Sequence, residues 1–543
     1  MNILNKTCLY NPHLQIFSLI LIFLTVVSKG ITTGDAWFTD ASRHAMNGVY
    51  FLDLFSKGSF DNIYQSAIEY YARYPALSLG YHPPFFPFVE SIVFAIGGVS
   101  FLTARFAVLI FGVVGLIFWY KLIRLMYDER IAFFSTLFIF TTPFVVYWSR
   151  EVMLELPALT MIILTVYAFY MFIELHRRKY VYMLSICLGL SLLTKQTTFF
   201  LMPLFFIYLL KTKRLSVLFK KDVILPALIL LCLCTIAVAL TVIFGQGALN
   251  LANMPVGLIA GSEHPKLSIT NMIYYLGRFN NIFSLQIILL SIFSFIFLLP
   301  KFRYNYLDLF FLWFLIDYIL ISYISVKDLR YAFFLIPPIC LIATLTLFKL
   351  DSVVKKPRIV LLLAFLLGSM QSVQAYNLPT PYISGYEAAA KFLAQRVDNG
   401  AIFLSGYHDA NFTFNFRKHC QNSNNLIIRM QMLVYKNGED SKNIDFLKVF
   451  NDYGIRSVVV EDINIDNDTQ LARLKKVLNT SKFTKLKKFP IESNVNSFKN
   501  KSILIYEYNQ ASQSMKDSIR ITIGVAGKDF YVPTQRPPNR ITH

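Results

Sequence analysis

Hydrophobic residues fall into long runs that are apolar on every side. Such runs are typical of helices that lie inside a membrane. We predict a mainly α-helical polytopic membrane protein with about 11 spans, or 11 to 13 if the shorter runs also cross. The runs lie near residues 14–28, 101–120, 131–147, 154–173, 180–195, 198–211, 223–245, 281–299, 306–324, 331–348 and 358–375. No small-x-small cleavage site follows the first run, which favours an uncleaved helix over a signal peptide.

One further apolar run, FFPFVESIVFAIG at residues 85–97, contains Glu90 and ends at Gly97 and Gly98. If this run crossed the membrane, the basic loop at 121–130 would move to the opposite side. We therefore expect a helix that lies at the outer interface of the membrane.

Lysine and arginine are distributed unevenly between alternate loops. The loops near 121–130, 174–179, 211–221, 300–304 and 349–358 hold 17 of them, and the alternate loops near 143–153, 194–197 and 325–330 hold 4. Because basic loops stay in the cytoplasm, the N-terminus is expected inside. A first outer loop (30–84), a second large outer loop (246–280) and everything after residue 376 are then expected outside.

The composition changes near residue 384. Helical spacing in GYEAAAKFLAQRV and SKNIDFLKVFNDYG alternates with the β-rich runs AIFLSG, IRSVVVED and KSILIYEYN. This pattern predicts an extracytoplasmic α/β domain over 376–510, after a membrane domain over 1–375. The basic stretch 511–543 is expected to be a flexible tail.

Composition supports the membrane assignment. The chain has 543 residues, of which 55% are hydrophobic and 15% charged, whereas soluble proteins carry about a quarter charged residues. The net charge of +20 comes with the basic loops, so we expect no nucleic-acid partner. The six cysteines form no CxxC pattern, which excludes a disulfide framework and a thiolate zinc site.

The first outer loop carries candidate chemistry in GDAWFTDASRHAMNG. Asp35 and Asp40 alternate with aromatic residues, and Arg43 and His44 follow at once. Such acids can simply face water. Their aromatic surroundings at the membrane surface instead favour carboxyl groups with shifted pKa values, as functional sites use.

A second group follows in YWSREVMLELPALT, where Glu151 and Glu155 share a helix face below Arg150. Glu155 lies one turn inside an apolar run, where an ionisable group needs a partner or a task. A local Arg–Glu pair is the simpler alternative.

Two further segments place cations at the same outer level. Lys195 stands in LLTKQTTFFLMP, and Lys327 and Arg330 stand beside Tyr331 in SVKDLRYAFFLIPP. Arginine forks suit phosphates, although snorkelling of these side chains to the interface would also explain them.

Acids and bases from four separate segments are thus expected at one depth, where a lipid phosphate presents its head group. This indicates transfer from a lipid-linked donor. A transporter or flippase would need polar residues near the membrane midplane and often paired repeats, and the sequence has no internal repeat. A receptor or assembly factor would need no acids at this level.

The order of these segments resembles that of the GT-C glycosyltransferases, and within them the protein O-mannosyltransferases and bacterial aminoarabinose transferases. The resemblance covers residues 14–375. Where the family usually has a second acid, Ala36 follows Asp35, and Glu155 stands where the family often has aspartate. The matching segments are, in order, Asp35, residues 43–48 (RHAMNG), residues 82–84 (HPP), Arg150 with residues 155–157 (ELP), residues 194–195 (TK), and residues 330–331 (RY) before Pro337 and Pro338.

The resemblance implies inverting transfer of a sugar from a polyprenyl-phosphate donor, with Asp35 as general base and Glu155 holding the acceptor or assisting the base. It implies that Lys195, Arg330 and Tyr331 bind the donor phosphate. The residues implied to shape the pocket are Asp40, Arg43, His44, His82 and Arg150.

The resemblance implies no certain cofactor. Some relatives bind a divalent metal ion and others need none, and His264 and Glu155 are the candidate ligands here. The sugar and the acceptor (protein, lipid or glycan) stay open. The overall pattern and the few cysteines favour a bacterial plasma membrane.

Overall fold

The computed structural model describes residues 11–58, 62–78, 81–244, 265, 268–294, 306–396, 400–421, 425–434, 444–462, 469–510, 518–523 and 528–533. The chain divides into two compact units. The helical unit comprises Met1–Thr32, Arg105–Val242 and Ala248–Thr380, and the mixed unit comprises Thr33–Ala104, Ile243–Gly247 and Pro381–His543.

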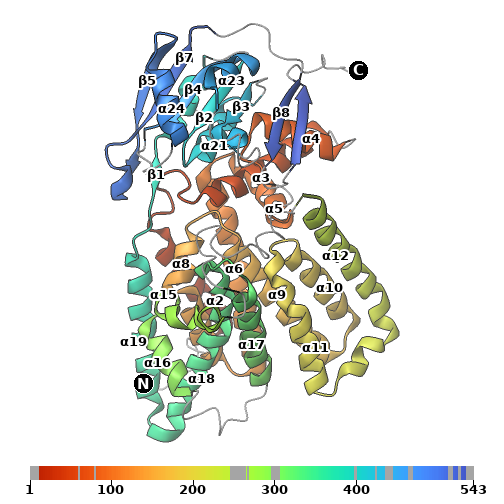
Figure 1. Ribbon diagram of the computed structural model, residues 1–543. Coiled ribbons are helices and arrows are strands. Elements are labelled where there is room, and N and C mark those ends of the chain that lie inside the picture. Colours follow the sequence, from red (N-terminus) through yellow and green to blue (C-terminus); the bar gives the residue numbers. More distant parts are fainter. Residues whose placement is uncertain are drawn as a thin grey trace. The chain divides into compact units, whose positions relative to one another are not determined.

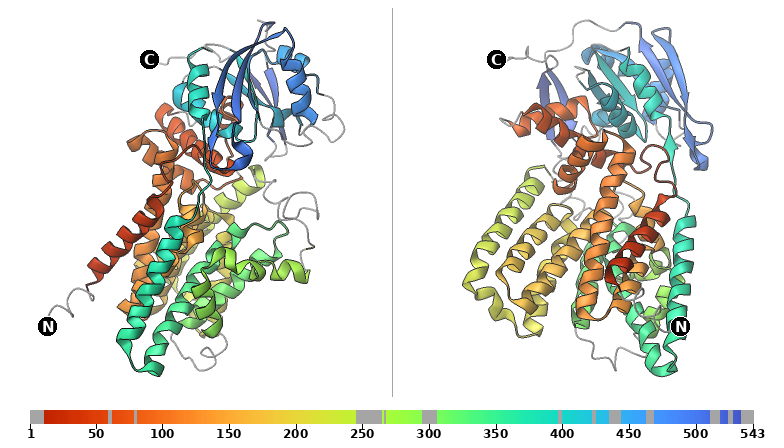
Figure 2. Two further views of the ribbon diagram at one scale, coloured as in Figure 1. Left: turned by 90° about the vertical axis from the view of Figure 1, so that its left-hand side faces the viewer. Right: turned by 180° about the vertical axis from the view of Figure 1, so that it is seen from behind.

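Helices make up the helical unit (Figure 1), and α6 enters it from the mixed unit. Its α-helices are α2 (Pro12–Ser28), α6 (Phe101–Met126), α7 (Glu129–Phe140), α8 (Pro143–Ser149), α9 (Glu155–Leu175), α10 (Arg178–Leu192), α11 (Leu201–Lys211), α12 (Ile224–Phe244), α14 (Ile269–Ile273), α15 (Phe279–Ile282), α16 (Leu285–Phe293), α17 (Leu307–Tyr323), α18 (Ile336–Val354) and α19 (Pro357–Asn377). Its 3₁₀ turns include η1 (Gln196–Phe200) and η7 (Leu329–Leu335). The pair α18 and α19 forms a helical hairpin (Figure 2), and its turn puts Lys355 in the left-handed region with φ 53°.

Within the described residues, five helices are long and apolar enough to cross a membrane, or six if one bent pair counts as a span. Their surroundings differ. The segment Leu329–Asp351 has 89% of its most apolar window buried by protein, whereas Lys221–Leu240 has 6%. An apolar helix with so little protein around it needs lipid as its solvent. Among the described residues, shorter apolar helices also form at Pro12–Ser28, Phe85–Gly97 and Gln196–Lys211. The prediction of a mainly helical multi-pass membrane protein is confirmed.

The bent pair is α7 and α8, which meet at an angle of 59°. Thr141 and Thr142 return their hydroxyls to carbonyls of α7 at 2.7 and 2.6 Å, and Pro143 then starts α8 without an N–H. Hydroxyl back-bonding and proline both loosen a helix. The buried amide of Gln371 donates to the carbonyl of Phe138 at 2.6 Å and so satisfies a backbone group at the break.

Helices from the first outer loop belong to the mixed unit, namely α3 (Thr39–Lys57), α4 (Ile63–Arg73) and α5 (Phe85–Gly97). The apolar helix α5 corresponds to the run expected at the interface, and Gly98 caps it with φ 76°. Helix α5 packs along α3, where the missing side chain of Gly48 makes room for Glu90.

The C-terminal segment builds the sheet of the mixed unit (Figure 1). Strand order is β3-β2-β4-β7-β5, with β2 parallel to β3 and β4, and β7 antiparallel to β4 and β5. The elements are β1 (Ile383–Ser384), α20 (Tyr386–Ala394), β2 (Ala401–Ser405), α21 (Asp409–His419), β3 (Leu426–Arg429), α22 (Met430–Val434), α23 (Phe446–Asp452), β4 (Ile455–Glu461), α24 (Thr469–Leu478), β5 (Phe483–Pro490), β6 (Glu492–Ser493), η9 (Asn496–Phe498), β7 (Ser502–Tyr508), β8 (Ser518–Ile523) and β9 (Lys528–Pro533).

The predicted α/β segment is thus confirmed, but its extent differs from the expected division. Tyr50 and Ile68, from the first loop, share one hydrophobic core with Phe403 and Val458 of the sheet. The loop therefore folds with the C-terminal segment. In the stretch expected to be a tail, β8 and β9 pair in antiparallel fashion.

Candidate active site

Asp35 is held against the C-terminal segment of the mixed unit. Its backbone N–H donates to the carbonyl of Ile383 at 2.7 Å, and its side chain is 7% exposed. Gly34 has φ 66°, and a Cβ there would lie 2.4 Å from the same carbonyl oxygen. Glycine before the aspartate is therefore required for this close approach.

Helix α21 supplies the side chains that contact this loop. The amide of Asn415 donates to Oδ1 of Asp35 at 2.9 Å, and the amide of Asn411 donates to the carbonyl of Ala36 at 2.8 Å. The ring Nε2 of His408 lies 3.0 Å from the carbonyl of Trp37. Three consecutive residues of the loop are thus bound by helix α21 and its N-cap residue, His408.

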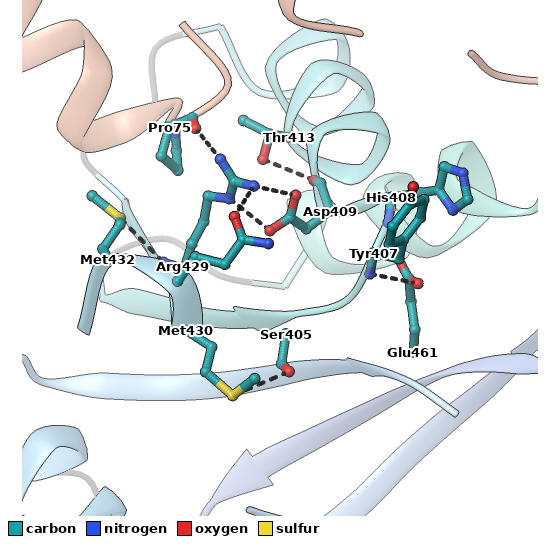
Figure 3. A network of polar contacts seen from close by, with 11 residues as sticks. Pro75, Ser405, Tyr407, His408, Asp409, Thr413, Arg429, Met430, Met432 and Glu461 are labelled. Carbon is teal, nitrogen blue, oxygen red and sulfur yellow. Dashed lines mark hydrogen bonds and ion pairs between the residues drawn. The ribbon is translucent and has the colours of Figure 1, made fainter. Parts of the chain in front are cut away.

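The start of α21 is anchored to the ends of the parallel strands (Figure 3). The carboxylate of Glu461 accepts the backbone N–H groups of Tyr407 and His408, both at 2.9 Å. Asp409 receives the guanidinium fork of Arg429 at 2.6 and 2.7 Å. The carboxyl group of Glu461 thus satisfies two backbone N–H groups at the start of α21.

Burial perturbs two groups of this anchor in opposite directions. The pKa of Glu461 is raised to about 8, by burial first and by the charge of Asp409 second. Burial lowers the pKa of His408 to about 4, against the opposing effect of its bond to Trp37. The imidazole is therefore neutral at pH 7.

These shifts predict how stability depends on pH. Between pH 4.5 and about 8 the folded chain binds more protons at Glu461 than the unfolded chain does. The contribution of Glu461 to the free energy of unfolding therefore falls as pH rises. At His408 the unfolded chain binds more protons between pH values of about 4 and 6.5. The contribution of His408 to the free energy of unfolding therefore rises with pH. Between pH 6.5 and 8, of these two groups only Glu461 still changes the free energy of unfolding, which falls as pH rises. We expect Glu461→Gln to remove it, as measured by melting temperatures at pH 6.5 and 8.

The control for this prediction is Glu507→Gln, on the exposed side of the neighbouring strand β7. In this variant the melting temperature should change between pH 6.5 and 8 as it does in the wild type. An equal change in the wild type and in Glu461→Gln would contradict the role given to Glu461.

The remaining predicted residues of the first loop separate into two groups. Asp40 and Arg43 form a partly exposed ion pair on α3 at 3.6 Å. The rings of His44 and His82 lie 4.3 Å apart, with His44 buried. Glu90 is fully buried and neither of its oxygens has a hydrogen bond within the described part of the chain.

In the helical unit, two predicted residues form a buried ion pair. Nζ of Lys195 lies 2.8 Å from Oε1 of Glu155, and the two side chains are 12% and 3% exposed. The ammonium also lies 5.9 Å from the ring centre of Tyr331 and 5.7 Å from that of Phe334. Residues from three separate segments therefore meet around the ammonium of Lys195.

A second acid, which the sequence pattern was not used to predict, lies near Lys195. Asp317 is fully buried in α17, and its electrostatic environment includes the charge of Lys195. The signal was present in the sequence, since Asp317 is a lone acid in the middle of an apolar run. The cluster contains two carboxyl groups and one ammonium.

Two predicted cations of the helical unit are already bound by protein groups. The guanidinium of Arg330 contacts Asp328 at 2.8 Å and lies 5.5 Å from the ring centre of Trp148. Arg150 is buried and donates to the backbone carbonyls of Val26, Ala375, Tyr376 and Leu378 and to the hydroxyl of Thr380. Arg150 thus ties the ends of α2 and α19 together.

The described residues offer no group of three or more histidine, cysteine, aspartate or glutamate side chains that could hold a metal ion. His264, one candidate ligand, lies outside the described residues. Glu155, the other candidate, forms an ion pair with the ammonium of Lys195.

A pocket of about 310 Å³ lies between α3 and α4 of the mixed unit. Tyrosine rings and charged groups line it, among them Asp53, Glu69 and Arg73. Asp53 forms an ion pair with Arg417 of α21 and accepts a hydrogen bond from Tyr70 at 2.8 Å. This contact adds a second link between α3 and α21.

Comparison with known proteins supports the resemblance. Residues 81–242 match the family model of dolichyl-phosphate-mannose-protein mannosyltransferases. No curated protein sequence matches the chain significantly.

Solved structures match over nearly the whole chain. ArnT from Cupriavidus metallidurans in the apo state is 13% identical, with 92% of this chain and 99% of that chain covered and a TM-score of 0.61. Its complex with undecaprenyl phosphate is 14% identical, with the same coverage and a TM-score of 0.57. The apo oligosaccharyltransferase of Archaeoglobus fulgidus is 12% identical, with 84% of this chain and 70% of that chain covered and a TM-score of 0.54. The chain has the GT-C fold.

Proposed function

We propose that the chain is an integral membrane glycosyltransferase that moves a sugar from a polyprenyl-phosphate donor to an acceptor at the extracytoplasmic face. The observation that carries this proposal is the likeness of 92% of the chain to ArnT, one structure of which holds undecaprenyl phosphate. The family match over residues 81–242 supports the same reaction class. The uneven distribution of lysine and arginine supports the sidedness.

The proposed reaction is a displacement at the anomeric carbon with inversion. An acceptor hydroxyl attacks this carbon, its oxygen forms the new glycosidic bond, and the bond to the phosphate oxygen breaks. The polyprenyl phosphate leaves with the electron pair. Asp35 takes the proton of the attacking hydroxyl, and its restrained carboxylate suits a base that must stay aligned within about 3 Å of that proton.

Lys195 is the residue proposed to stabilise the departing phosphate. Charge grows on the phosphate as the bond breaks, so a nearby ammonium lowers the barrier. Glu155 accepts a hydrogen bond from Lys195 at 2.8 Å and is proposed to orient this ammonium. Arg330 and Tyr331 are proposed to contact the same phosphate. Because Asp328 already holds Arg330, binding through that fork would compete with an existing ion pair.

A flippase for a lipid-linked saccharide is the second candidate. Asp317 favours it, because a buried acid within an apolar helix is the type of residue that transport pathways use. Both candidates would bind the same lipid, so they differ in whether the bond to the phosphate is broken.

The test is to supply membranes that contain the wild-type chain with radiolabelled polyprenyl-phosphate sugars of several kinds. Transfer of label from lipid to a water-soluble or second lipid product supports the transferase. Movement of intact labelled lipid to the opposite leaflet, shown by protection from an outside-acting reagent without any loss of label, supports the flippase and contradicts the transferase.

A further inference from the structure

We propose that helix α21 positions the catalytic base, with Asn415 as the residue that orients the carboxylate of Asp35. The inference rests on the proposed function and adds to it a role for the C-terminal α/β segment. Asn415 is a positioning residue, since it contacts the base and is not proposed to touch the substrate.

The first argument is the pattern of contacts. Asn411 and Asn415 are four residues apart, so they lie on one face of α21. Their amides contact Ala36 and Asp35 at 2.8 and 2.9 Å, and the oxygen of Asn411 accepts the hydroxyl of Ser42 at 2.7 Å. One helix face thus binds the base itself and two residues that follow it in the chain.

The second argument is that this face is rigidly supported. The start of α21 is bound by Glu461, which ends strand β4, and by Arg429, which ends strand β3. The missing side chain of Gly406 allows this, because a Cβ there would lie 2.4 Å from the carboxylate of Glu461. A base held by a helix that is fixed to a sheet keeps its geometry better than one on a loop alone.

Side chains of the protein itself bind the start of α21. At the carboxyl ends of parallel strands, many α/β proteins bind an anion at a helix start. Here the carboxyl group of Glu461 accepts the backbone N–H groups of Tyr407 and His408 at the start of α21. The anchor is therefore built to hold α21, and α21 contacts the loop that carries Asp35.

The hydrogen bond from Asn415 has a second consequence besides orientation. A donor to a carboxylate oxygen favours the charged form, which is the form that accepts a proton. Tyr386 of α20 is a titratable side chain whose electrostatic environment includes Asp35, together with Glu461 and Asp409. Burial raises the pKa of Tyr386 well above its ordinary value, so it stays neutral over the useful pH range.

The experiment measures kcat/KM for label transfer against pH in wild-type, Asn415→Leu and Asn415→Asp proteins. Without the donor, Asp35 takes up a proton at higher pH, and the acid limb of the profile should move up by about one pH unit in Asn415→Leu. A second acid beside Asp35 should move it further in Asn415→Asp. The folded fraction is measured at each pH and kcat/KM is divided by it, so a loss of folding at low pH is not read as a shift of the limb.

Thr413→Val is the matched control. Thr413 lies on the same helix, is buried, and donates its hydroxyl to the carbonyl of Asp409 at 3.1 Å. The variant also loses one buried hydrogen bond, and it should keep the wild-type acid limb. A shift of equal size in Thr413→Val would show that any disturbance of α21 has this effect and would overturn the assignment to Asn415.

The two levels of the proposal fail differently. If the wild type transfers label, Asp35→Asn does not, and Asn415→Leu keeps the wild-type profile, the positioning role is wrong and the proposed function stands. If the wild type transfers no label, or Asp35→Asn transfers it fully, the proposed function or its base is wrong, and the positioning role is wrong with it.

Discussion

Replacing Asp35 with asparagine is expected to lower sugar transfer by about 10²- to 10⁴-fold, the contribution typical of a positioned general base. Asparagine has nearly the same shape, and its side-chain oxygen can still accept the hydrogen bond that Asn415 donates at 2.9 Å. The fold should therefore survive while the proton acceptor is lost. The measurement is the rate of label transfer from the donor at saturating concentration, with the melting temperature recorded beside it.

The control for this prediction is Glu387→Gln, which removes a carboxylate of the same unit. Glu387 is half exposed and pairs with Lys418 on the surface. Its loss should leave the rate of transfer within about twofold, because exposed ion pairs contribute little. If Asp35→Asn kept the wild-type rate and Asp40→Asn lost it, the role of base would belong to Asp40.

The second large effect is expected for Lys195→Met. Methionine fills a similar volume but removes the ammonium that lies 2.8 Å from Glu155, so buried carboxyl groups are left without their cation. Breaking one side of a buried ion pair costs about 3–5 kcal/mol in the free energy of unfolding. Donor turnover should fall as well, since the proposed phosphate contact is lost.

A double variant separates the two effects. Lys195→Met combined with Glu155→Gln removes the unpaired charge along with the cation, and most of the lost melting temperature should return. Transfer should stay low, because no ammonium faces the phosphate. Recovery of both stability and transfer would show that the pair is structural only and would contradict the donor-binding role.

The matched control is Lys211→Met, which breaks the ion pair between Lys211 and Asp308. The distance is similar, 2.9 Å, but the side chains are 50% and 61% exposed. Water replaces such a partner, so the free energy of unfolding should change by about 0–1 kcal/mol.

Membrane architecture could be predicted from the sequence because its cause is local. A run such as 154–173 is apolar in every direction, and only a helix in lipid or protein satisfies its backbone. The helix α9 that forms there is buried over 83% of its most apolar window. The short β-rich runs AIFLSG and IRSVVVED likewise predicted the strands β2 and β4 without knowledge of their partners.

The site was only partly predictable. Asp35, Glu155 and Lys195 stood out because charged groups beside apolar runs need a physical reason, and the pairing of Glu155 with Lys195 fits that reason. Asn415 and His408 gave no such signal. Polar residues in a soluble helix are ordinary, and their importance comes from the groups that they contact.

By itself the sequence determined the apolar helices, the strands β2, β4 and β7, and which charged side chains need partners, since these follow from the periodicity and polarity of neighbouring residues. Only the tertiary structure decided that the loop carrying Asp35 folds with a segment nearly 400 positions away, where Asn415 donates to it across a separation of 380 residues. The physical reason is that hydrogen bonds and packing act between surfaces brought together by folding. The same pattern of helices and strands is compatible with several tertiary arrangements. In this structure Tyr50 of the first loop and Phe403 of the sheet share one hydrophobic core, which fixes how the two segments pack.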